Sequence, residues 1–395
     1  MKLKKTSRAV KFLAAFLLLS ILLSCSAFAV PNGTENEAEP EYPELGLTCK
    51  SAVLMEASTG KILYAKNPDE ALPPASVTKV MTLLLIMEEI DSGRLKYTDT
   101  VTASANAASM GGSQIYLKEG ESMTVEDLLK SVVIASANDA AVALAEHIAG
   151  SEEAFVTRMN KRAEALGMTA THFENTNGLD DTTQNHVTSA RDIAIMSREL
   201  IKHRKIFDYS STWMDTIRNG TFGLTNTNRL VRFYKGATGL KTGSTSKAKF
   251  CISATACRGG MDLICVIMAA DTRDIRNEEA KKLLDWGFAN YELFTSPSES
   301  LGNVKVMGGT ESTVGAEQMG FSCVVNKGEA AKVERLTELP EAVSAPVKKG
   351  SAIGKTAFKI GDRTIGECDI LSTDDVQKIG VWQLFGRILK GFFIK

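Results

Sequence analysis

Ser76 and Lys79 stand three residues apart at the start of a long apolar stretch, and together they could form a nucleophile and its base. On a helix, residues three apart share a face, so the hydroxyl and the amine would lie side by side. The amine can take the serine proton only when it is uncharged, and burial or a nearby cation lowers the pKa of a lysine. The pair therefore predicts covalent catalysis, against the simpler interpretation of a helix-capping serine and a solvated lysine.

The S-x-x-K pattern is weak without its context. Three other matches occur in the chain, at Ser58–Lys61, Ser244–Lys247 and Ser246–Lys249. Only Ser76 follows two prolines, Pro73 and Pro74, which favour an extended chain that ends where a helix begins. Backbone N–H groups point outward at a helix start, so a serine there can be exposed and close to donors for a developing oxyanion. The context favours Ser76 as the nucleophile.

Two further motifs could complete such a site. Ser136-Ala137-Asn138 lies between helical stretches, and Lys241-Thr242-Gly243, the only K-T-G of the chain, precedes a strand-like run. A second lysine beside Lys79 would supply the cation that lowers its pKa. Taken singly, the first motif could cap a helix and Lys241 could be solvated at a strand end. A second S-x-N, Ser104–Asn106, lies in a polar stretch, and we interpret it as a chance match.

A Ser-His-Asp triad is the other nucleophilic arrangement that the residue types allow. The chain has four histidines, at His147, His172, His186 and His203. Two lie in helical stretches and two flank a loop, and no G-x-S-x-G elbow accompanies them. The sequence therefore disfavours a triad.

The N-terminal segment predicts export. Residues 1–29 combine a basic start, an apolar run and the small-x-small sequence Ala27-Phe28-Ala29, which is typical of a cleaved signal peptide. Leu22–Cys25 also resembles a lipoprotein acylation site, although the leucine before Ser24 fits it poorly. The whole chain has 46 basic and 47 acidic residues, and five of the basic ones lie in this segment. The remainder is acidic and has no basic block, which argues against a nucleic-acid partner.

Hydrophobic patterning predicts an α+β fold: an antiparallel sheet with a helical insertion. Residues 51–67 and 249–271 read as hairpins, and helices dominate between them, with starts expected at Thr124, Ser151 and Thr188. An amphipathic helix is expected over 275–294. The pattern therefore divides the chain into a flexible leader at 30–46, this domain at 47–295, a small β domain at 298–372 and a terminal helix at 374–395.

The terminal segment predicts an amphipathic helix that lies on a membrane surface. Basic residues interrupt it too often for a spanning helix. Its apolar side would hold Val381, Trp382, Leu384, Phe385, Ile388, Leu389, Phe392 and Phe393, and its polar side Gln383, Arg387 and Lys390. Aromatic residues inward and cations toward the headgroups suit an interfacial anchor. The alternative is a helix that packs on the protein's own core.

The cysteines predict neither a metal site nor a particular disulfide. Six lie outside the signal segment: Cys49, Cys251, Cys257, Cys265, Cys323 and Cys368. None forms a C-x-x-C pair, so a zinc cluster is not expected, and we expect no cofactor. Export permits disulfides, but several of these residues lie in strand-like runs where a buried free thiol is equally plausible.

The ordered set S-x-x-K, S-x-N and K-T-G is the mark of penicillin-binding proteins and class A β-lactamases. With "PPASVTKVMT", "GGSQIYL", "IASANDAAVALAE", "NTNRL", "GLKTGSTSKAKF" and "RNEEAKKLLDWGF", the chain resembles the low-molecular-weight penicillin-binding proteins of serine peptidase family S11, over residues 45–372. These proteins are D-alanyl-D-alanine carboxypeptidases. The resemblance implies a β-lactamase/transpeptidase-like domain at 47–295, followed by a small β domain and an amphipathic anchor.

The resemblance also implies a role for each matching residue. Ser76 would be acylated, Lys79 would be the base, and Ser136 would relay a proton. Asn138 would hold the substrate amide, Lys241 would act electrostatically, and Thr242, Gly243 and Ser244 would line the pocket. The backbone N–H groups of Ser76 and Ser244 would form the oxyanion hole. Arg276 matches an arginine that binds the terminal carboxylate, with Arg273 as its competitor, and Ser244 stands where the family often has histidine.

The implied reaction removes the terminal D-alanine from peptidoglycan stem peptides through an acyl-enzyme, and β-lactams would leave a slowly hydrolysed ester on Ser76. Three alternatives stay open. A class A β-lactamase needs a loop glutamate, for which Glu174 is the only candidate in a comparable region and lies in an unlike sequence. A D,D-endopeptidase would cut crosslinks instead. A penicillin sensor or wall-binding module would form an acyl-enzyme that never releases.

Overall fold

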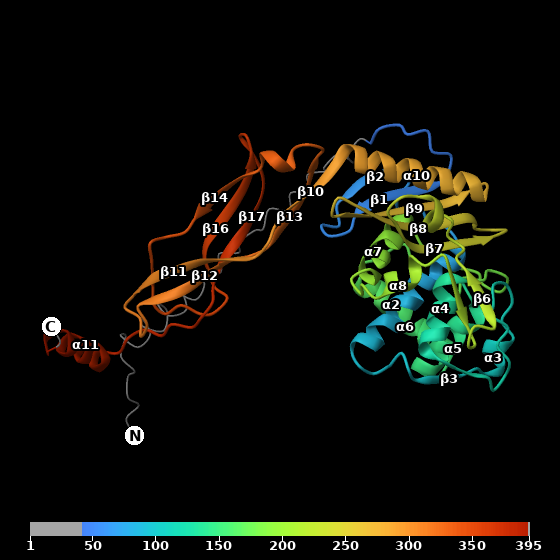
Figure 1. Ribbon diagram of the computed structural model, residues 1–395, viewed down its shortest axis with the longest axis horizontal. Helices are drawn as coiled ribbons and strands as arrows, with labels where there is room; N and C mark the ends of the chain where they lie inside the picture. The colour runs from blue at the N-terminus through green and yellow to red at the C-terminus, as the bar shows by residue number, and fades with distance from the viewer. Residues whose placement is uncertain (1–41, 394–395) are drawn as a thin grey trace, which may run out of the picture. The chain divides into compact units, whose positions relative to one another are not determined.

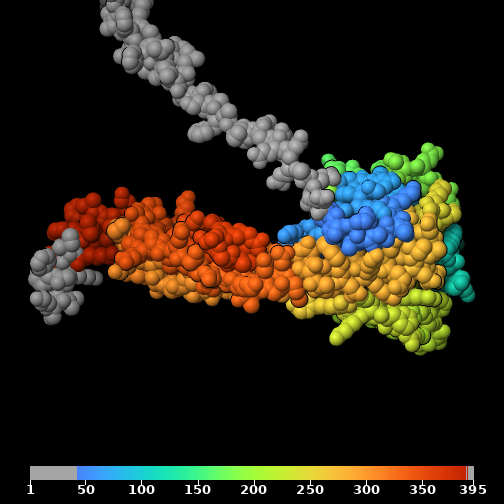
Figure 2. Space-filling model, turned by 90° about the horizontal axis from the view of Figure 1, so that it is seen from above, coloured from blue at the N-terminus to red at the C-terminus, as the bar shows by residue number. Residues whose placement is uncertain are grey.

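The computed structural model describes residues 42–393. The expected signal peptide at 1–29 and most of the expected leader at 30–46 lie outside the described residues. The segment around Thr48 lies against the larger domain, because the backbone N–H and the hydroxyl of Thr48 donate to Glu279 Oε1 at 2.5 and 2.8 Å. Figure 2 shows this segment (blue) beside the helix that carries Glu279 (gold).

A five-stranded antiparallel sheet forms the larger domain's framework. Its strands are, in spatial order, β2 (Ile62–Lys66), β1 (Ser51–Glu56), β9 (Met261–Ala270), β8 (Lys249–Arg258) and β7 (Ala237–Thr245). Two strands come from the start of the domain and three from its end, so the long segment between them is inserted in the sheet's connectivity. The prediction of an α+β fold with a helical insertion is confirmed.

The insertion is mostly helical. Its helices are η1 (Ala75–Thr78, a 3₁₀ turn), α2 (Lys79–Asp91), α3 (Ala105–Ala108), α4 (Val125–Ile134), α5 (Asn138–Ala149), α6 (Glu152–Ala165), α7 (Ala190–Leu200), α8 (Ile206–Ser210) and α9 (Leu230–Phe233). Two small hairpins, β3 (Thr100–Thr102) with β4 (Ser122–Thr124) and β5 (Met214–Ile217) with β6 (Phe222–Thr225), complete it. In Figure 1, α7 and α2 lie on one side of the sheet and α10 (Arg273–Asn290) on the other.

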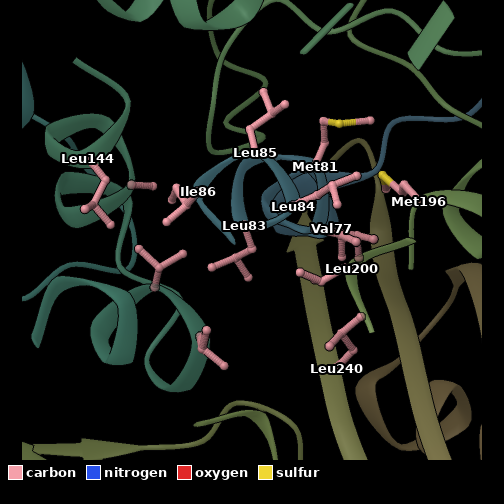
Figure 3. Close-up of a cluster of buried hydrophobic side chains, with 14 of the residues drawn as sticks. Val77, Met81, Leu83, Leu84, Leu85, Ile86, Leu144, Met196, Leu200 and Leu240 are labelled. Carbon is pink, nitrogen blue, oxygen red and sulfur yellow. The ribbon is translucent and has the colours of Figure 1, made fainter. Parts of the chain in front are cut away.

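The α2 helix is the centre of the larger core. Ten of its residues are buried, including a continuous run from Lys79 to Met87. Figure 3 shows Leu83, Leu84, Leu85 and Ile86 pointing to different sides of the helix. Side chains from three other elements surround it: Leu144 of α5, Met196 and Leu200 of α7, and Leu240 of β7. A helix that is apolar all round is buried all round, so its first turn is held rigidly at the sheet.

The expected helix starts agree with the structure to within a residue or two. The hydroxyls of Thr124 and Ser151 accept hydrogen bonds from the backbone N–H groups of Asp127 and Ala154, and thereby cap α4 and α6. The α7 helix is capped by Ser189 rather than Thr188. The expected helix at 275–294 ends earlier, because residues from Tyr291 form β10 (Tyr291–Ser296).

A small β domain follows. Its six-stranded sheet has the order β14 (Glu334–Glu338), β16 (Ala352–Ile360), β17 (Arg363–Ser372), β12 (Thr313–Gln318), β11 (Glu299–Met307) and β15 (Ala342–Ser344). A two-stranded sheet joins β10 to β13 (Phe321–Asn326), and a short 3₁₀ turn, η2 (Ala330–Lys332), follows. Phe321 stacks on the buried Phe358, with ring centroids 4.4 Å apart, and so contributes to its core.

The terminal helix α11 (Val381–Phe393) exposes apolar side chains. Val381 and Trp382 are 82% and 86% exposed, and Leu384, Phe385 and Leu389 are also exposed. The Arg387 guanidinium donates to the carbonyls of Gly309 and Thr310 in the β domain. Within residues 42–393, no helix is long and apolar enough to cross a membrane.

The six described cysteines are free thiols. Cys49, Cys251 and Cys265 are buried, and Cys257, Cys323 and Cys368 are half-buried. Of the two states that the sequence left open, the structure shows unpaired thiols at all six described positions.

Candidate active site

Ser76 lies in the 3₁₀ turn η1, directly before α2. Pro74 precedes the turn, and Ala75 takes a left-handed backbone conformation with φ +48°. The Ser76 side chain is half-buried and lines a cleft, whereas its neighbours Ala75 and Val77 are buried. The α-helix begins at Lys79 rather than at Ser76, so the two side chains meet across the junction of the two helices.

Lys79 is fully buried, and its amine has three neighbours. Nζ lies 3.0 Å from Ser76 Oγ, 2.5 Å from Asn138 Oδ1 and 2.8 Å from the carbonyl oxygen of Asn177. Amide and carbonyl oxygens only accept hydrogen bonds, so two N–H groups of the amine point to them. A neutral amine then has its lone pair left for the hydroxyl proton of Ser76. The geometry suits a base that accepts from this serine.

Electrostatics favour the neutral form of this amine. Burial lowers the pKa of Lys79 well below its ordinary value, and the nearby positive charge of Lys241 lowers it further. The Asp139 carboxylate acts in the opposite direction, as the smallest of the three influences. Both mechanisms that the sequence required of a lysine base, burial and a second cation, are therefore present at this position.

Ser136 and Lys241 form a second hydroxyl–amine pair. Lys241 Nζ donates to Ser136 Oγ at 2.8 Å and to the Thr242 carbonyl at 2.9 Å. Burial lowers the pKa of Lys241 to about 7, with a contribution from Arg276. Ser136 connects α4 to α5 in a left-handed conformation with φ +63°, which costs a non-glycine residue of the order of 1 kcal/mol. Such strain is found where a side chain must point in one direction.

Asn138 is a bridge rather than a helix cap. Its Oδ1 faces Lys79, and its Nδ2 donates to the Gly111 carbonyl at 2.7 Å. The N-terminal cap position of α5 is occupied by Ala137, without a side-chain hydrogen bond. The capping role considered from the sequence does not apply to Ser136 or Asn138. The other S-x-N behaves differently, because Ser104 caps α3 by accepting from Ala107 N–H at 3.0 Å.

The strand β7 meets η1 at Gly243. A Cβ atom placed there would lie 2.7 Å from the Pro74 carbonyl oxygen and 2.8 Å from the Ser76 nitrogen. Only glycine allows the strand to approach the turn this closely. This approach brings the segment of Ser244 beside the backbone of Ser76, where the resemblance implies an oxyanion hole.

Thr242 and Arg276 both line the cleft. Thr242 Oγ1 donates to Thr227 Oγ1 at 2.8 Å. Arg276, in α10, is 3% exposed and donates to Asn277 Oδ1 at 3.1 and 3.0 Å. Burial lowers its pKa to about 10, and Arg273 contributes, so the guanidinium remains charged at neutral pH.

The cleft has a volume of about 690 Å³, and Ser76 and Ser136 both line it. The other lining residues are Ser113, Trp213, Thr225, Asn226, Thr227, Arg229, Phe233, Thr242, Gly243, Ser244, Arg273 and Arg276. Lys79, Asn138 and Lys241 lie beneath this surface and are reached through their hydrogen bonds to the two serines or to each other. The structure thus brings all nine sequence-predicted site residues to one place, and Arg273 lies there as well.

Sequence reasoning assigned no role to Asn177, which supplies a backbone acceptor to Lys79. Its loop contains "NTNG", a turn signal that points to no chemistry. Gly178 in this loop lies so close to η1 that a Cβ atom would be 1.9 Å from the Ala75 carbonyl oxygen. The loop of residues 175–178 therefore packs directly against the nucleophile's turn.

His186 has a structural role behind this turn. Its Nδ1 accepts from the Glu174 backbone N–H at 2.9 Å, so Nε2 carries the proton and donates to Thr78 Oγ1 at 2.8 Å. Burial lowers the pKa of His186 to about 4. No hydrogen bond joins a described histidine to Ser76, which agrees with the sequence-based argument against a triad.

Glu174 does not resemble the deacylating glutamate of a β-lactamase. Its carboxylate accepts from the backbone N–H groups of Gln184 and Asn185 at 2.8 and 3.0 Å, and so closes its own loop. It does not line the cleft. Among residues 42–393, no group of three acidic, histidine or cysteine side chains could hold a metal ion.

Comparisons with known proteins agree with this geometry. A family model described as D-alanyl-D-alanine carboxypeptidase matches residues 35–272, and one described as penicillin-binding protein 5, C-terminal domain, matches residues 290–378. The D-alanyl-D-alanine carboxypeptidase DacF of Bacillus subtilis is 43% identical over 383 residues, which cover 94% of this chain and 96% of that relative.

Solved structures show the same relationship. Penicillin-binding protein 5 of Haemophilus influenzae has a TM-score of 0.75 and 33% identity, and the match covers 86% of this chain and 100% of that chain. Penicillin-binding protein D2 of Listeria monocytogenes, solved with ampicillin bound, has a TM-score of 0.58 and 31% identity, over 62% of this chain and 100% of that chain. The protein therefore belongs to the D-alanyl-D-alanine carboxypeptidase family of serine peptidases.

Proposed function

We propose that this protein, a serine-type D-alanyl-D-alanine carboxypeptidase, acts through an acyl-enzyme on Ser76. The observation that carries this proposal is the position of a fully buried lysine amine 3.0 Å from the Ser76 hydroxyl. The other two neighbours of the amine accept its N–H groups, and so direct its lone pair at the serine. Its substrates are peptidoglycan stem peptides, and β-lactams occupy the same cleft.

Acylation follows from this arrangement. Ser76 Oγ attacks the carbonyl carbon of the penultimate D-alanine while Lys79 takes its proton. The resulting oxyanion lies at the backbone N–H groups of Ser76 and Ser244. When the C–N bond breaks, the proton that Lys79 took passes through the Ser136 hydroxyl to the nitrogen of the terminal D-alanine, and Lys79 is neutral again. Lys241 donates to the Ser136 hydroxyl and holds it in place. Asn138 holds the substrate amide, and Arg276 with Thr242 holds the terminal carboxylate.

Water then hydrolyses the ester. Deacylation adds water to the ester carbonyl, and the Ser76 hydroxyl is restored. Oxyanion donors typically contribute about a hundred- to a thousandfold to the rate of such steps. A β-lactam opens its ring in the first step and keeps its leaving group attached, so the ester on Ser76 persists.

Mass spectrometry of a digest of diacetyl-L-Lys-D-Ala-D-Ala tests reaction type and direction. The purified protein should release one D-alanine per peptide. A protein that hydrolyses penicillin rapidly without a lasting adduct would instead be a β-lactamase, and an acyl-enzyme that never releases would mark a sensor.

A fluorescent penicillin tests the nucleophile. It should label the wild-type protein and fail to label Ser76→Ala. Ser246→Ala is the matched control, because Ser246 belongs to another S-x-x-K match and is exposed outside the cleft. Equal labelling of Ser76→Ala and wild type would refute the proposed nucleophile.

We also propose that the protein is exported and bound to the outer face of the cytoplasmic membrane by α11. The signal-like residues 1–29 support export. The exposed aromatic and aliphatic side chains of α11 support the membrane contact, because so much uncovered apolar surface is unusual in water.

A further inference from the structure

Three arginines line the cleft, and two of them affect the third electrostatically. Arg276 and Arg273 belong to α10, Arg229 immediately precedes α9, and all three line the same cavity. Arg273 and Arg229 are both among the positive charges that lower the pKa of Arg276. Arg276 therefore lies within the electrostatic range of both other guanidinium groups, and Asp274 opposes their effect as the last of the influences on its pKa.

Little negative charge compensates for this cluster. Asp274 and Glu278 line a neighbouring hollow with Arg229, but neither forms an ion pair with Arg229, and Glu278 pairs with Lys281 at 2.8 Å. Within residues 42–393, the guanidinium groups of Arg229 and Arg273 form no ion pair and no hydrogen bond, and the cavity lining holds no carboxylate. Like charges concentrated in a cleft create a local potential that favours an anion.

A single carboxylate would leave two of the three arginines without an anionic partner. A terminal D-alanine brings a single carboxylate, which Arg276 and Thr242 account for in the proposed function. The exposed side chains of Arg229 and Arg273 are then left to face the solvent. Arginine is the residue that binds a carboxylate with two parallel hydrogen bonds, so the pair is suited to a further carboxylate.

We propose that Arg229 and Arg273 form a second carboxylate-binding subsite next to Arg276, which recognises an acidic side chain on the leaving group. The inference deepens the proposed function and rests on it, because the leaving group is placed by the role of Arg276. The substrate class consists of peptides in which an anionic D-residue, or a chain linked through an amino dicarboxylic acid, follows the penultimate D-alanine.

Aromatic side chains would contact the apolar part of such a group. Phe233 is 64% exposed and lines the cleft together with Trp213, at a ring-centroid distance of 6.2 Å. The Arg232 guanidinium lies 5.5 Å from the centres of both rings and is not part of the cleft lining. Arg232 is therefore the matched control: it belongs to the same short segment and carries the same charge outside the proposed subsite.

The test compares three peptides that differ in the leaving residue. Diacetyl-L-Lys-D-Ala-D-Glu and diacetyl-L-Lys-D-Ala-D-Gln have nearly the same shape and differ by one negative charge, and diacetyl-L-Lys-D-Ala-D-Ala is the reference. Release of the leaving amino acid gives kcat/KM for each. The same peptides also compete with a fluorescent penicillin, which measures binding without turnover.

The wild-type protein should prefer the D-Glu peptide to the D-Gln peptide by about tenfold, which is the scale of one or two partly exposed charge pairs. The preference should fall as salt is added. It should disappear in the double variant Arg229→Gln/Arg273→Gln and persist in Arg232→Gln.

The outcomes separate the two proposals. Release of D-alanine with equal use of the D-Glu and D-Gln peptides overturns the subsite and leaves the proposed function intact. Without release from any peptide, the proposed function fails, and competition against penicillin still decides the subsite: equal competition by the two peptides overturns it, and stronger competition by the D-Glu peptide supports it. A preference that survives the double variant also overturns it.

Discussion

At the scale of single residues, the site depends on which neighbours of Lys79 can only accept hydrogen bonds. Asn138 and Asn177 present oxygen atoms to Lys79, so a neutral amine that donates to both would have its lone pair left for Ser76, 3.0 Å away. Asn138 is held in this orientation by its own donation to Gly111. The orientation of one amide therefore decides whether the buried amine can act as a base.

The first prediction concerns the pH dependence of acylation. Because Lys79 must be neutral, the rate of penicillin acylation should rise with pH as this lysine loses its proton. Lys241→Gln removes the neighbouring cation that lowers the pKa of Lys79, so the acidic limb of the profile should move to higher pH. Stopped-flow acylation from pH 5 to 9 measures this limb. The exposed Lys235→Gln variant is the control, and an unmoved limb in Lys241→Gln would contradict the coupling.

The second prediction concerns His186. Its pKa is about 4 in the folded protein because of burial, against an ordinary value of 6.5. The unfolded chain binds a proton more readily, so this residue destabilises the fold as the pH falls from 6.5 toward 4. Between pH 7.5 and pH 5 the loss in free energy of unfolding should be about 2 kcal/mol.

Urea unfolding at both pH values measures this loss. His186→Gln should lose stability by about 2 kcal/mol less than wild type over the same pH interval. His147→Gln, at an exposed position of α5, should behave as wild type does. An identical pH dependence in His186→Gln and wild type would show that His186 does not titrate in this way.

At the scale of elements, three segments clamp the nucleophile's turn. The buried α2 continues from η1 into the core, β7 approaches the turn at Gly243, and the loop of residues 175–178 approaches it at Gly178. The turn is short and strained at Ala75, and it is held because its neighbours leave no room for another conformation.

The third prediction tests this clamp. Gly243→Ala would place a methyl group 2.7 Å from the Pro74 carbonyl oxygen and 2.8 Å from the Ser76 nitrogen, so β7 and η1 must separate. Separation moves the expected oxyanion donors apart, and penicillin acylation should slow by about a hundredfold or more. Gly223→Ala in β6 is the control, because a Cβ atom there meets nothing within 4 Å. Acylation of Gly243→Ala at the wild-type rate would contradict the close approach.

At the scale of the whole molecule, the chain combines a catalytic domain with a β domain and a helix that exposes apolar side chains. The terminal helix is tied to the β domain through Arg387, which donates to Gly309 and Thr310. Its exposed side chains are therefore presented by a folded domain, as the proposed membrane contact requires.

The fourth prediction tests this contact. Trp382→Glu/Phe385→Glu places two charges on the exposed apolar side chains of α11, so binding to anionic phospholipid vesicles should fall by about tenfold or more. Sedimentation with vesicles measures the bound fraction. Leu336→Glu changes an exposed apolar residue of β14 and should bind as wild type. Equal sedimentation of the α11 variant and wild type would remove the support for an anchor.

The sequence by itself determined the chemistry and the class of fold. Ser76, Lys79, Ser136, Asn138 and Lys241 are recognisable because their residue types and order are specific, and hairpins on both sides of helices predict the sheet with its insertion. Local signals such as the capping residues Thr124 and Ser151 also placed helix starts correctly, because a cap acts within one turn.

Only the tertiary structure decided how these residues act. The lowered pKa of Lys79 depends on its burial and on Lys241, a lysine 162 positions away in the chain. The Asn177 carbonyl takes one of the hydrogen bonds of its amine. The residue types do not show which backbone carbonyls will accept hydrogen bonds from the site. The cluster of Arg229 with Arg273 and Arg276 brings together two segments that are distant in the sequence. Such features arise from packing between elements, whereas motifs and caps arise within them.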